Sequence, residues 1–315
     1  MSEPKSKTPG FYRYFPLSER DRKWGLCITT TGETSIGPHQ PYPPAGHPKA
    51  YDFEWSRGRV LHDYQIVYVS KGRGWFESRE TPRQSIESGT VFLLFPQMWH
   101  RYRPEPETGW VEHWIGFEGD IPRRWAKHGF FSPKAPILRP VPEDALLGLY
   151  SRVIEAVRSQ QPALQQVLAG LVSQMAGLLY SASQGRLTGQ AQSVSAIQRA
   201  IDQMQSELAV NLDAPALAQQ LGVSYSWFRR TFAEHTGLSP HQYLLELCLV
   251  RARTLLSQTT LSVKAVASEV GFEDEHYFCR LFRRKTGVTP TEWRTRLRAQ
   301  TPSGRDAQTA SASPA

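Results

Sequence analysis

The pattern of apolar and polar positions changes character along the chain. Before about Pro140, short apolar runs of strand composition at 64–69, 75–77, 91–95 and 110–115 alternate with segments rich in Gly and Pro. The Gly-containing segments 71–74 and 87–89 are typical of turns. Several short strands at close spacing predict an antiparallel sandwich or barrel.

Helical periodicity replaces this pattern from Val141 onward. One face of a first predicted helix carries Leu146, Tyr150, Val153 and Val157. After a break at 160–162, a second helix carries apolar residues in alternating steps of four and three, namely Leu164, Leu168, Leu171, Met175 and Leu178. This heptad stripe fits a dimer interface and fits packing against the chain's own sheet equally well. The polar, aperiodic stretch 181–193 predicts a flexible linker.

The last third of the chain contains an internal repeat. Residues 217–223 parallel residues 266–272 at an offset of 49. At an offset of 50, the residues Phe228, Arg230, Phe232, Thr236, Gly237 and Pro240 recur as Phe278, Arg280, Phe282, Thr286, Gly287 and Pro290. Each copy predicts a helix, a tight turn at Gly222 or Gly271, and a second helix that ends at a glycine. The repeat therefore predicts two helix-turn-helix units.

The second helix of each unit has an outward face suited to DNA. Once the apolar positions face inward, the residues left to contact DNA are Ser226, Trp227, Arg229, Arg230, Glu275, His276, Arg280, Arg283 and Arg284. Arginine can donate two hydrogen bonds to guanine, and other cations neutralise phosphates. Asp274 and Glu275 can cap the second helix, accept from cytosine, or do both. A solvated helix face is the alternative for any one residue, and two copies at fixed spacing argue against it.

Composition and charge are compatible with a nucleic-acid partner but do not select one. The 315 residues are 40% hydrophobic, and a formal charge of +8 admits nucleic acid or an anionic surface. The excess is spread along the chain, with +4 in residues 1–136 and +3 in residues 190–299. No apolar run approaches the length of a membrane span. Three distant cysteines make no disulfide framework, so we expect a cytoplasmic protein.

Residues 193–298 resemble the DNA-binding domain of the AraC/XylS family of bacterial transcription regulators. The resemblance is carried by residues 271–290 with the following Glu292-Trp-Arg294, and by residues 237–243 leading into 251–253. It implies two helix-turn-helix units joined by a linker helix at about 240–258, which bind two successive major-groove segments of double-stranded operator DNA. It also implies contact with RNA polymerase and favours activation over repression. Trp293 stands where the family more often has Tyr or Phe.

Residues 51–117 resemble, more weakly, the cupin-like effector domain of sugar-responsive members of this family. The resemblance places effector contacts at Arg57, Tyr102, Glu112 and Trp114, and implies a small-molecule effector, typically a monosaccharide, covered by an N-terminal arm. Aromatic faces suit sugar C–H groups, while Arg and Glu bind hydroxyls. Glu112 replaces a histidine usual in the family, which leaves the identity of the sugar open. The alternative is a set of core aromatics with an Arg57–Glu112 pair.

The sequence lacks the residues that an enzyme of this architecture would need. Metal-dependent cupins need a His-x-His pair, and none occurs among the nine histidines. No cysteine stands in a motif for a reactive thiol, and the sequence contains neither a phosphate-binding glycine loop nor a nucleophile elbow. We therefore expect no catalysis, no metal and no cofactor.

Together these patterns predict an α+β multidomain protein with an N-terminal antiparallel cupin-like β-barrel, a helical hairpin and a C-terminal all-α domain. The expected parts are an effector-sensing domain at 1–140, a dimerisation hairpin at 141–185, a linker at 186–192, the paired helix-turn-helix domain at 193–299 and a disordered tail at 300–315. The expected function is a homodimeric transcription regulator that responds to a sugar. Alternatives are a regulator that responds to a non-sugar metabolite, or a cupin enzyme fused to a DNA-binding domain.

Overall fold

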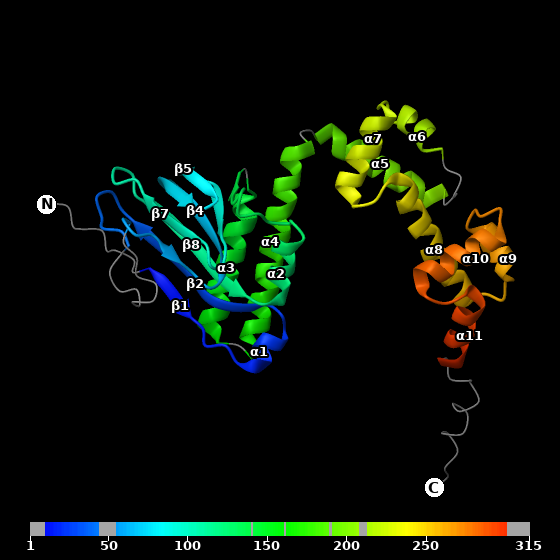
Figure 1. The fold of residues 1–315 in the computed structure, drawn as a ribbon, viewed down its shortest axis with the longest axis horizontal. Coiled ribbons are helices and arrows are strands. Elements are labelled where there is room, and N and C mark those ends of the chain that lie inside the picture. The colour runs from blue at the N-terminus through cyan, green and yellow to red at the C-terminus, as the bar shows by residue number, and fades with distance from the viewer. Residues whose placement is uncertain are drawn as a thin grey trace, which may run out of the picture. The chain divides into compact units, whose positions relative to one another are not determined.

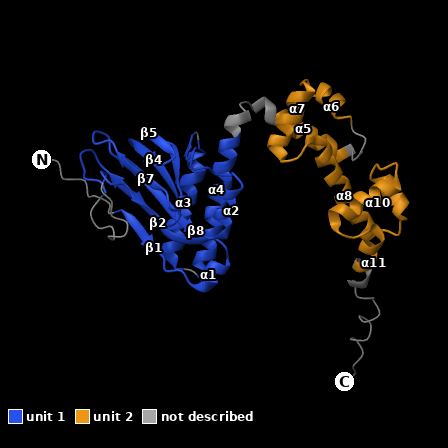
Figure 2. Ribbon diagram, viewed as in Figure 1, with its two compact units in different colours: residues 1–187 blue, residues 188–315 orange. Residues whose placement is uncertain are grey.

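The computed structural model describes residues 10–43, 55–139, 141–160, 162–188, 191–207 and 213–300. The chain divides into two compact units, residues 1–187 and 188–315, which we describe separately (Figure 2). Residues 301–315, which make up all but the first position of the predicted tail, lie outside the described residues, as do residues 1–9 of the predicted arm.

The described part of the first unit contains nine strands, all paired antiparallel (Figure 1). They are β1 (Phe11–Tyr14), β2 (Cys27–Ile36), β3 (Arg59–Val60), β4 (Tyr64–Ser78), β5 (Thr81–Glu87), β6 (Thr90–Leu94), β7 (Trp99–Pro104), β8 (Trp110–Glu118) and β9 (Ile137–Leu138). The first layer has the order β1-β2-β8-β4-β6-β9. The second layer contains β3, β7, β5 and the distal half of β4.

Strand β4 belongs to both layers, and its course shows that one turn predicted from the sequence is wrong. The sequence predicts a turn at 71–74, but β4 continues without interruption from Tyr64 to Ser78. A register shift between Val69 and Lys71 and a φ of 84° at Gly72 bend the strand, so that it leaves the first layer and enters the second. The predicted turn at 87–89 is confirmed, with Gly89 at a φ of 78° between β5 and β6.

Two apolar cores follow from the alternation of side chains along the strands. Val67 and Val69 of β4 face the interior between the layers, with Phe76, Phe92 and Trp110. Ile66 and Tyr68 face the opposite side, where they pack against α3 (Glu143–Ser159) and α4 (Leu164–Thr188). Two short helices, α1 (Glu19–Lys23) and α2 (Asp120–Lys127), complete the first unit.

The heptad stripe of α4 packs internally. Leu168, Leu171 and Met175 are buried in the core shared with the sheet and α3, and Leu164 and Leu178 pack against that core. The predicted break after α3 is confirmed, because the helix ends at Ser159 and Gln160 has a positive φ of 48°. The predicted linker at 186–192 is helical over its described residues, since α4 continues to Thr188 and α5 begins at Ala191.

The second unit is helical throughout its described residues. Its helices are α5 (Ala191–Glu207), α6 (Ala214–Gln220), α7 (Tyr225–Thr236), α8 (Pro240–Gln258), α9 (Val263–Glu269), α10 (Glu275–Thr286) and α11 (Pro290–Gln300). The pairs α6–α7 and α9–α10 share one core, in which α8 contributes residues such as Leu249 and Leu256. The predicted α+β multidomain fold is therefore confirmed. No helix in the described ranges of either unit is long and apolar enough to cross a membrane.

Internal packing of the stripe predicts the effect of shortening it. Leu168→Ala removes buried methyl groups and should lower the free energy of unfolding by about 2–5 kcal/mol. Gln174→Ala, on the exposed side of α4, should change it by less than about 0.5 kcal/mol. Urea unfolding followed by tryptophan fluorescence reports mainly on the first unit, which holds most of the tryptophans. A Leu168→Ala variant that unfolds like wild type but loses self-association would place the stripe at a dimer interface instead.

Candidate DNA interface and effector site

Each helix-turn-helix unit is fixed by local capping. Ser224 accepts a hydrogen bond from the Trp227 amide at the start of α7, and Asp274 accepts from the His276 amide at 2.7 Å at the start of α10. Of the roles that the sequence leaves open for Asp274, capping of α10 is therefore confirmed. These amide donors hold the pKa of Asp274 below its usual range, so the carboxylate stays charged at the positive end of the helix. Gly237 and Gly287 end the two helices in the left-handed conformation, as predicted.

The inward faces of α7 and α10 match each other. Phe228 and Phe232 of α7 are fully buried, and Phe278 and Phe282 occupy the corresponding positions in α10. Leu281 is also buried. The apolar positions chosen from the sequence are thus the core positions, and the opposite face of each helix is left to solvent.

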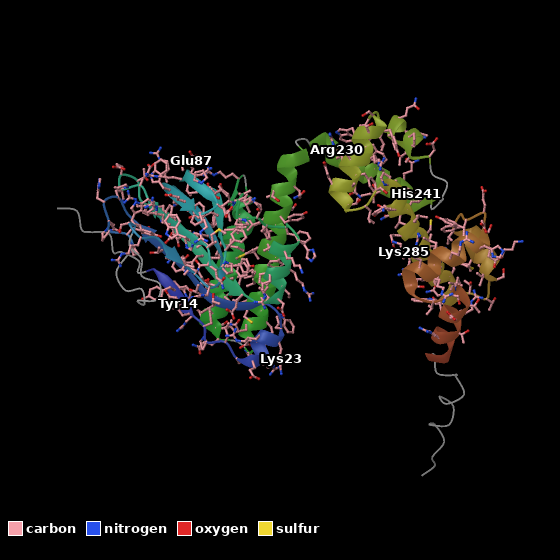
Figure 3. The ribbon with its side chains drawn as sticks, in the orientation of Figure 1. Tyr14, Lys23, Glu87, Arg230, His241 and Lys285 are labelled. Atoms are coloured by element: carbon pink, nitrogen blue, oxygen red, sulfur yellow. The ribbon has the colours of Figure 1, made fainter. Side chains whose placement is uncertain are left out.

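The structure brings the predicted DNA contacts onto those outward faces, with two exceptions. The exposed residues are Ser226, Arg229 and Arg230 on α7 and His276, Arg280, Arg283 and Arg284 on α10. Trp227 is half-buried and packs against the core of the unit, and Glu275 is half-buried at the start of α10. Arg230 lies 4.0 Å from Glu234 one turn further on, an exposed pair that leaves its guanidinium accessible (Figure 3).

Two sets of hydrogen bonds that orient the helices of the second unit were not predicted from the sequence. Lys285 of α10 donates to Glu246 of α8 at 2.6 Å, so this lysine faces the linker helix (Figure 3 labels Lys285). Arg294 of α11 donates to the carbonyl oxygens of Leu256, near the end of α8, and of Leu261, between α8 and α9. Lys285 and Glu246 are 39 positions apart, and Arg294 is 38 and 33 positions from Leu256 and Leu261. Local sequence patterns therefore carry no signal for these contacts.

In the first unit, strands β7 and β8 direct a polar and aromatic cluster into the interior. Tyr102 from β7 and Trp110, Glu112 and Trp114 from β8 are all buried, as period-two alternation requires. Trp114 lies against Gly32 of β2, where a Cβ atom would overlap the indole ring. Three of the four predicted effector contacts therefore share one interior.

The fourth predicted contact, Arg57, lies elsewhere. Its side chain is exposed in the turn before β3, and its carbonyl oxygen accepts from the Trp99 indole at 2.7 Å. The guanidinium inside the cluster belongs to Arg59, which donates to the Tyr102 hydroxyl and, at 3.4 Å, to Nε2 of His100. Strand β3 begins only at Arg59 and has two residues, so no local pattern shows that the strand, and with it the inward direction, starts at Arg59 rather than at Arg57.

Burial sets the protonation states of the cluster. It raises the pKa of Glu112 to about 8 and that of Tyr102 to about 12, so both hold their protons at neutral pH. Burial, with Arg59 nearby, lowers the pKa of His100 to about 3. A neutral His100 can donate from Nδ1 to the Met98 carbonyl oxygen at 3.0 Å and accept from Arg59 at Nε2. Tyr42 donates to Glu112 at 3.4 Å from the loop after β2.

The cluster combines one guanidinium, one carboxyl, two phenols and indole faces around one interior. Such a set can hydrogen-bond the hydroxyl or carboxyl groups of a small molecule and stack on its apolar faces. Within the described residues, no group of three or more His, Cys, Asp or Glu side chains is placed to hold a metal ion.

These features define a DNA-binding regulator with a separate ligand-binding domain. A family model described as an AraC-like ligand binding domain matches residues 46–201, and one described as a helix-turn-helix domain matches residues 217–296. The chain belongs to the AraC family of transcription regulators. Its relatives are regulators rather than enzymes.

Three curated relatives illustrate the similarity. The MmsAB operon regulatory protein of Pseudomonas aeruginosa is 29% identical over 259 residues, which cover 79% of this chain and 80% of that protein. The raffinose operon transcriptional regulatory protein RafR of Pediococcus pentosaceus is 23% identical over 77% of this chain and 88% of its own length. The HTH-type transcriptional activator RhaR of Salmonella heidelberg is 36% identical over 98 residues, 30% of this chain and 35% of its own.

The raised pKa of Glu112 predicts a pH dependence of stability. In the unfolded chain this carboxyl loses its proton near its ordinary pKa of 4.5, whereas the folded protein keeps the proton until about pH 8. The free energy of unfolding should therefore fall as pH rises from about 5 to about 8, by up to about 1.4 kcal/mol per pH unit.

Glu112→Gln should remove this part of the pH dependence while keeping the side chain's size. The measurement is urea unfolding of both proteins at several pH values, compared as a difference so that other titrating groups cancel. Parallel pH profiles for wild type and Glu112→Gln would show that Glu112 is ionised in the folded protein.

Proposed function

We propose that this regulator binds operator DNA by placing α7 and α10 in two successive major-groove segments, with Arg230 and Arg280 contacting base edges. The observation that carries the proposal is the matched pair of outward faces on two helices with equivalent buried faces. Arg230 and Arg280 occupy equivalent positions, separated by 50 residues, and both are exposed. Exposed Arg229, Arg283 and Arg284 lie beside them and suit phosphate contacts.

The proposed effector is a monosaccharide bound within the first unit. Tyr102, Glu112 and Trp114 would contact it, and Arg59 rather than Arg57 would contribute the guanidinium. The support is the combination of aromatic faces with polar groups that remain hydrogen-bonding at neutral pH. A further support is that one of the relatives is the regulator of a raffinose operon, which is a sugar operon.

A non-sugar effector is the second candidate, and one observation favours it. The relative from Pseudomonas aeruginosa covers most of this chain, and its name refers to no sugar. The buried Arg59 guanidinium also suits a carboxylate as well as it suits a hydroxyl.

The proposal also covers the oligomeric state of the regulator and its contact with RNA polymerase. The regulator would act in the cytoplasm as a homodimer that contacts RNA polymerase and activates transcription. Because the heptad stripe is buried within the first unit, the dimer contact would use the exposed face of α4, which includes Val167, Gly170 and Gly177. Effector binding would shift the population between arrangements of the DNA-binding units and so change which half-sites a dimer spans.

The DNA proposal predicts the cost of removing a base contact. Arg230→Ala or Arg280→Ala should each weaken binding to a duplex selected in vitro by the wild-type chain by about 1–3 kcal/mol. Fluorescence anisotropy at fixed salt measures the change. Arg199→Ala, on the exposed side of α5, is the matched control and should have little effect. Isotherms that coincide for all four proteins would refute this orientation of the helices.

The effector proposal predicts a ligand-dependent shift in melting temperature. A monosaccharide panel should contain a member that raises the melting temperature of the full chain, because binding to the folded state alone stabilises it. Trp114→Ala should abolish the shift. Tyr102→Phe, which removes only the hydroxyl beside Arg59, should reduce it without a large loss of stability. A shift from a carboxylate metabolite and none from any sugar would favour the second candidate.

A further inference from the structure

One outer surface of the first unit carries an unusual set of side chains. The helices α3 and α4 pack on the first layer, and the outward side of the second layer, formed by β5, β4 and β7, is not part of that core (Figure 1). Its residues are Trp55, Trp75, Trp99, Arg83, Arg101 and Arg103, which we call the arginine–tryptophan face. All six are half-buried or exposed.

The arginines of this face crowd around one indole ring. The guanidinium carbons of Arg83, Arg101 and Arg103 lie 5.9, 4.7 and 4.4 Å from the centroid of Trp55. Arg83 also lies 4.3 Å from the centroid of Trp75. Stacking on an indole holds a guanidinium by its flat face and leaves its edge N–H groups available to an anion.

The charges on this face do not balance locally. Arg101 is bound by Glu77, with two nitrogen-to-oxygen distances of 2.8 and 2.9 Å, and donates to the Trp55 carbonyl oxygen. Arg83 and Arg103 have no carboxylate within salt-bridge distance among the described residues. The Nε–H of Arg103 is buried there without a hydrogen-bond acceptor. Two like charges held around one ring repel each other, and an anion between them would remove the repulsion.

We propose that the arginine–tryptophan face binds the phosphate backbone of duplex DNA that flanks the segments contacted by α7 and α10. The proposal rests on the proposed function, because the same chain then holds its polyanion nearby at a high effective concentration. Backbone contacts of this kind add affinity and salt dependence without sequence preference.

Arg83→Glu in the full chain tests the proposal, because Arg83 is exposed and its replacement should not disturb folding. Two probes carry the same in vitro selected site, a duplex of about 20 base pairs and one of about 60. On the longer duplex the variant should bind roughly tenfold more weakly, and its slope of log affinity against log salt should be shallower by about one. On the shorter duplex it should bind like wild type.

Arg124→Glu, an equal charge change on the exposed side of α2, is the control and should differ little between the two duplexes. Equal effects of Arg83→Glu and Arg124→Glu on both duplexes would overturn the proposal. The proposal would also be overturned if inorganic phosphate raised the melting temperature of the wild-type chain but not that of Arg83→Glu, while the two bound DNA equally well. That result would indicate a site for a small anion. Failure of the proposed function is a separate result, since Arg280→Ala would then bind the shorter duplex as wild type does.

Discussion

Strand β8 is buried on both of its faces, and this constraint organises the whole first unit. Side chains that alternate along such a strand must each serve one of two interiors. Glu112 and Trp114 enter the cluster between the layers, while His113 and Ile115 enter the interface with α3 and α4. His113 contacts the Tyr150 ring of α3 at 5.5 Å between centroids. Neighbouring residues of one strand thus belong to the two interiors, so a shift of the β8 backbone would affect the interior cluster and the packing of α3 and α4 together.

In the second unit the two helix-turn-helix copies keep the same interior and differ outside. Their buried phenylalanines are equivalent, because one shared core must accept both copies. Outward positions are not constrained by packing, and there α10 carries Arg283 and Arg284 where α7 has Ala233 and Glu234. The two helices thus carry different charge on their outward faces. This is the division expected when a duplicated fold is retained and its contacts diverge.

The sequence predicts those parts of the structure whose signal is local. The helix-turn-helix units follow from repeated glycines, prolines and phenylalanines. The position of Asp274 at the start of a predicted helix makes capping one of the roles that the sequence allows for it. The signal fails where tertiary packing decides. A Gly-rich segment at 71–74 reads as a turn because nothing local shows that β4 bends between two layers. Local sequence likewise does not show that a two-residue strand begins at Arg59 and leaves Arg57 in the preceding turn. The polar stretch after Gln184 is helical as far as Thr188 despite its poor local periodicity.

Affinity and specificity for DNA need not reside in the same part of such a molecule. Base edges can be read only by the few side chains that helix geometry directs into a groove, whereas a phosphate backbone is continuous and can be met by any preorganised cation. A recognition helix therefore gains little discrimination from more positive charge. Under the proposed function, charge on the sheet of the other unit would add binding energy and leave discrimination to Arg230, Arg280 and their neighbours. The arginine–tryptophan face fits the proposed role, because Arg83 and Arg103 lie over indole rings and have no salt bridge to a carboxylate among the described residues.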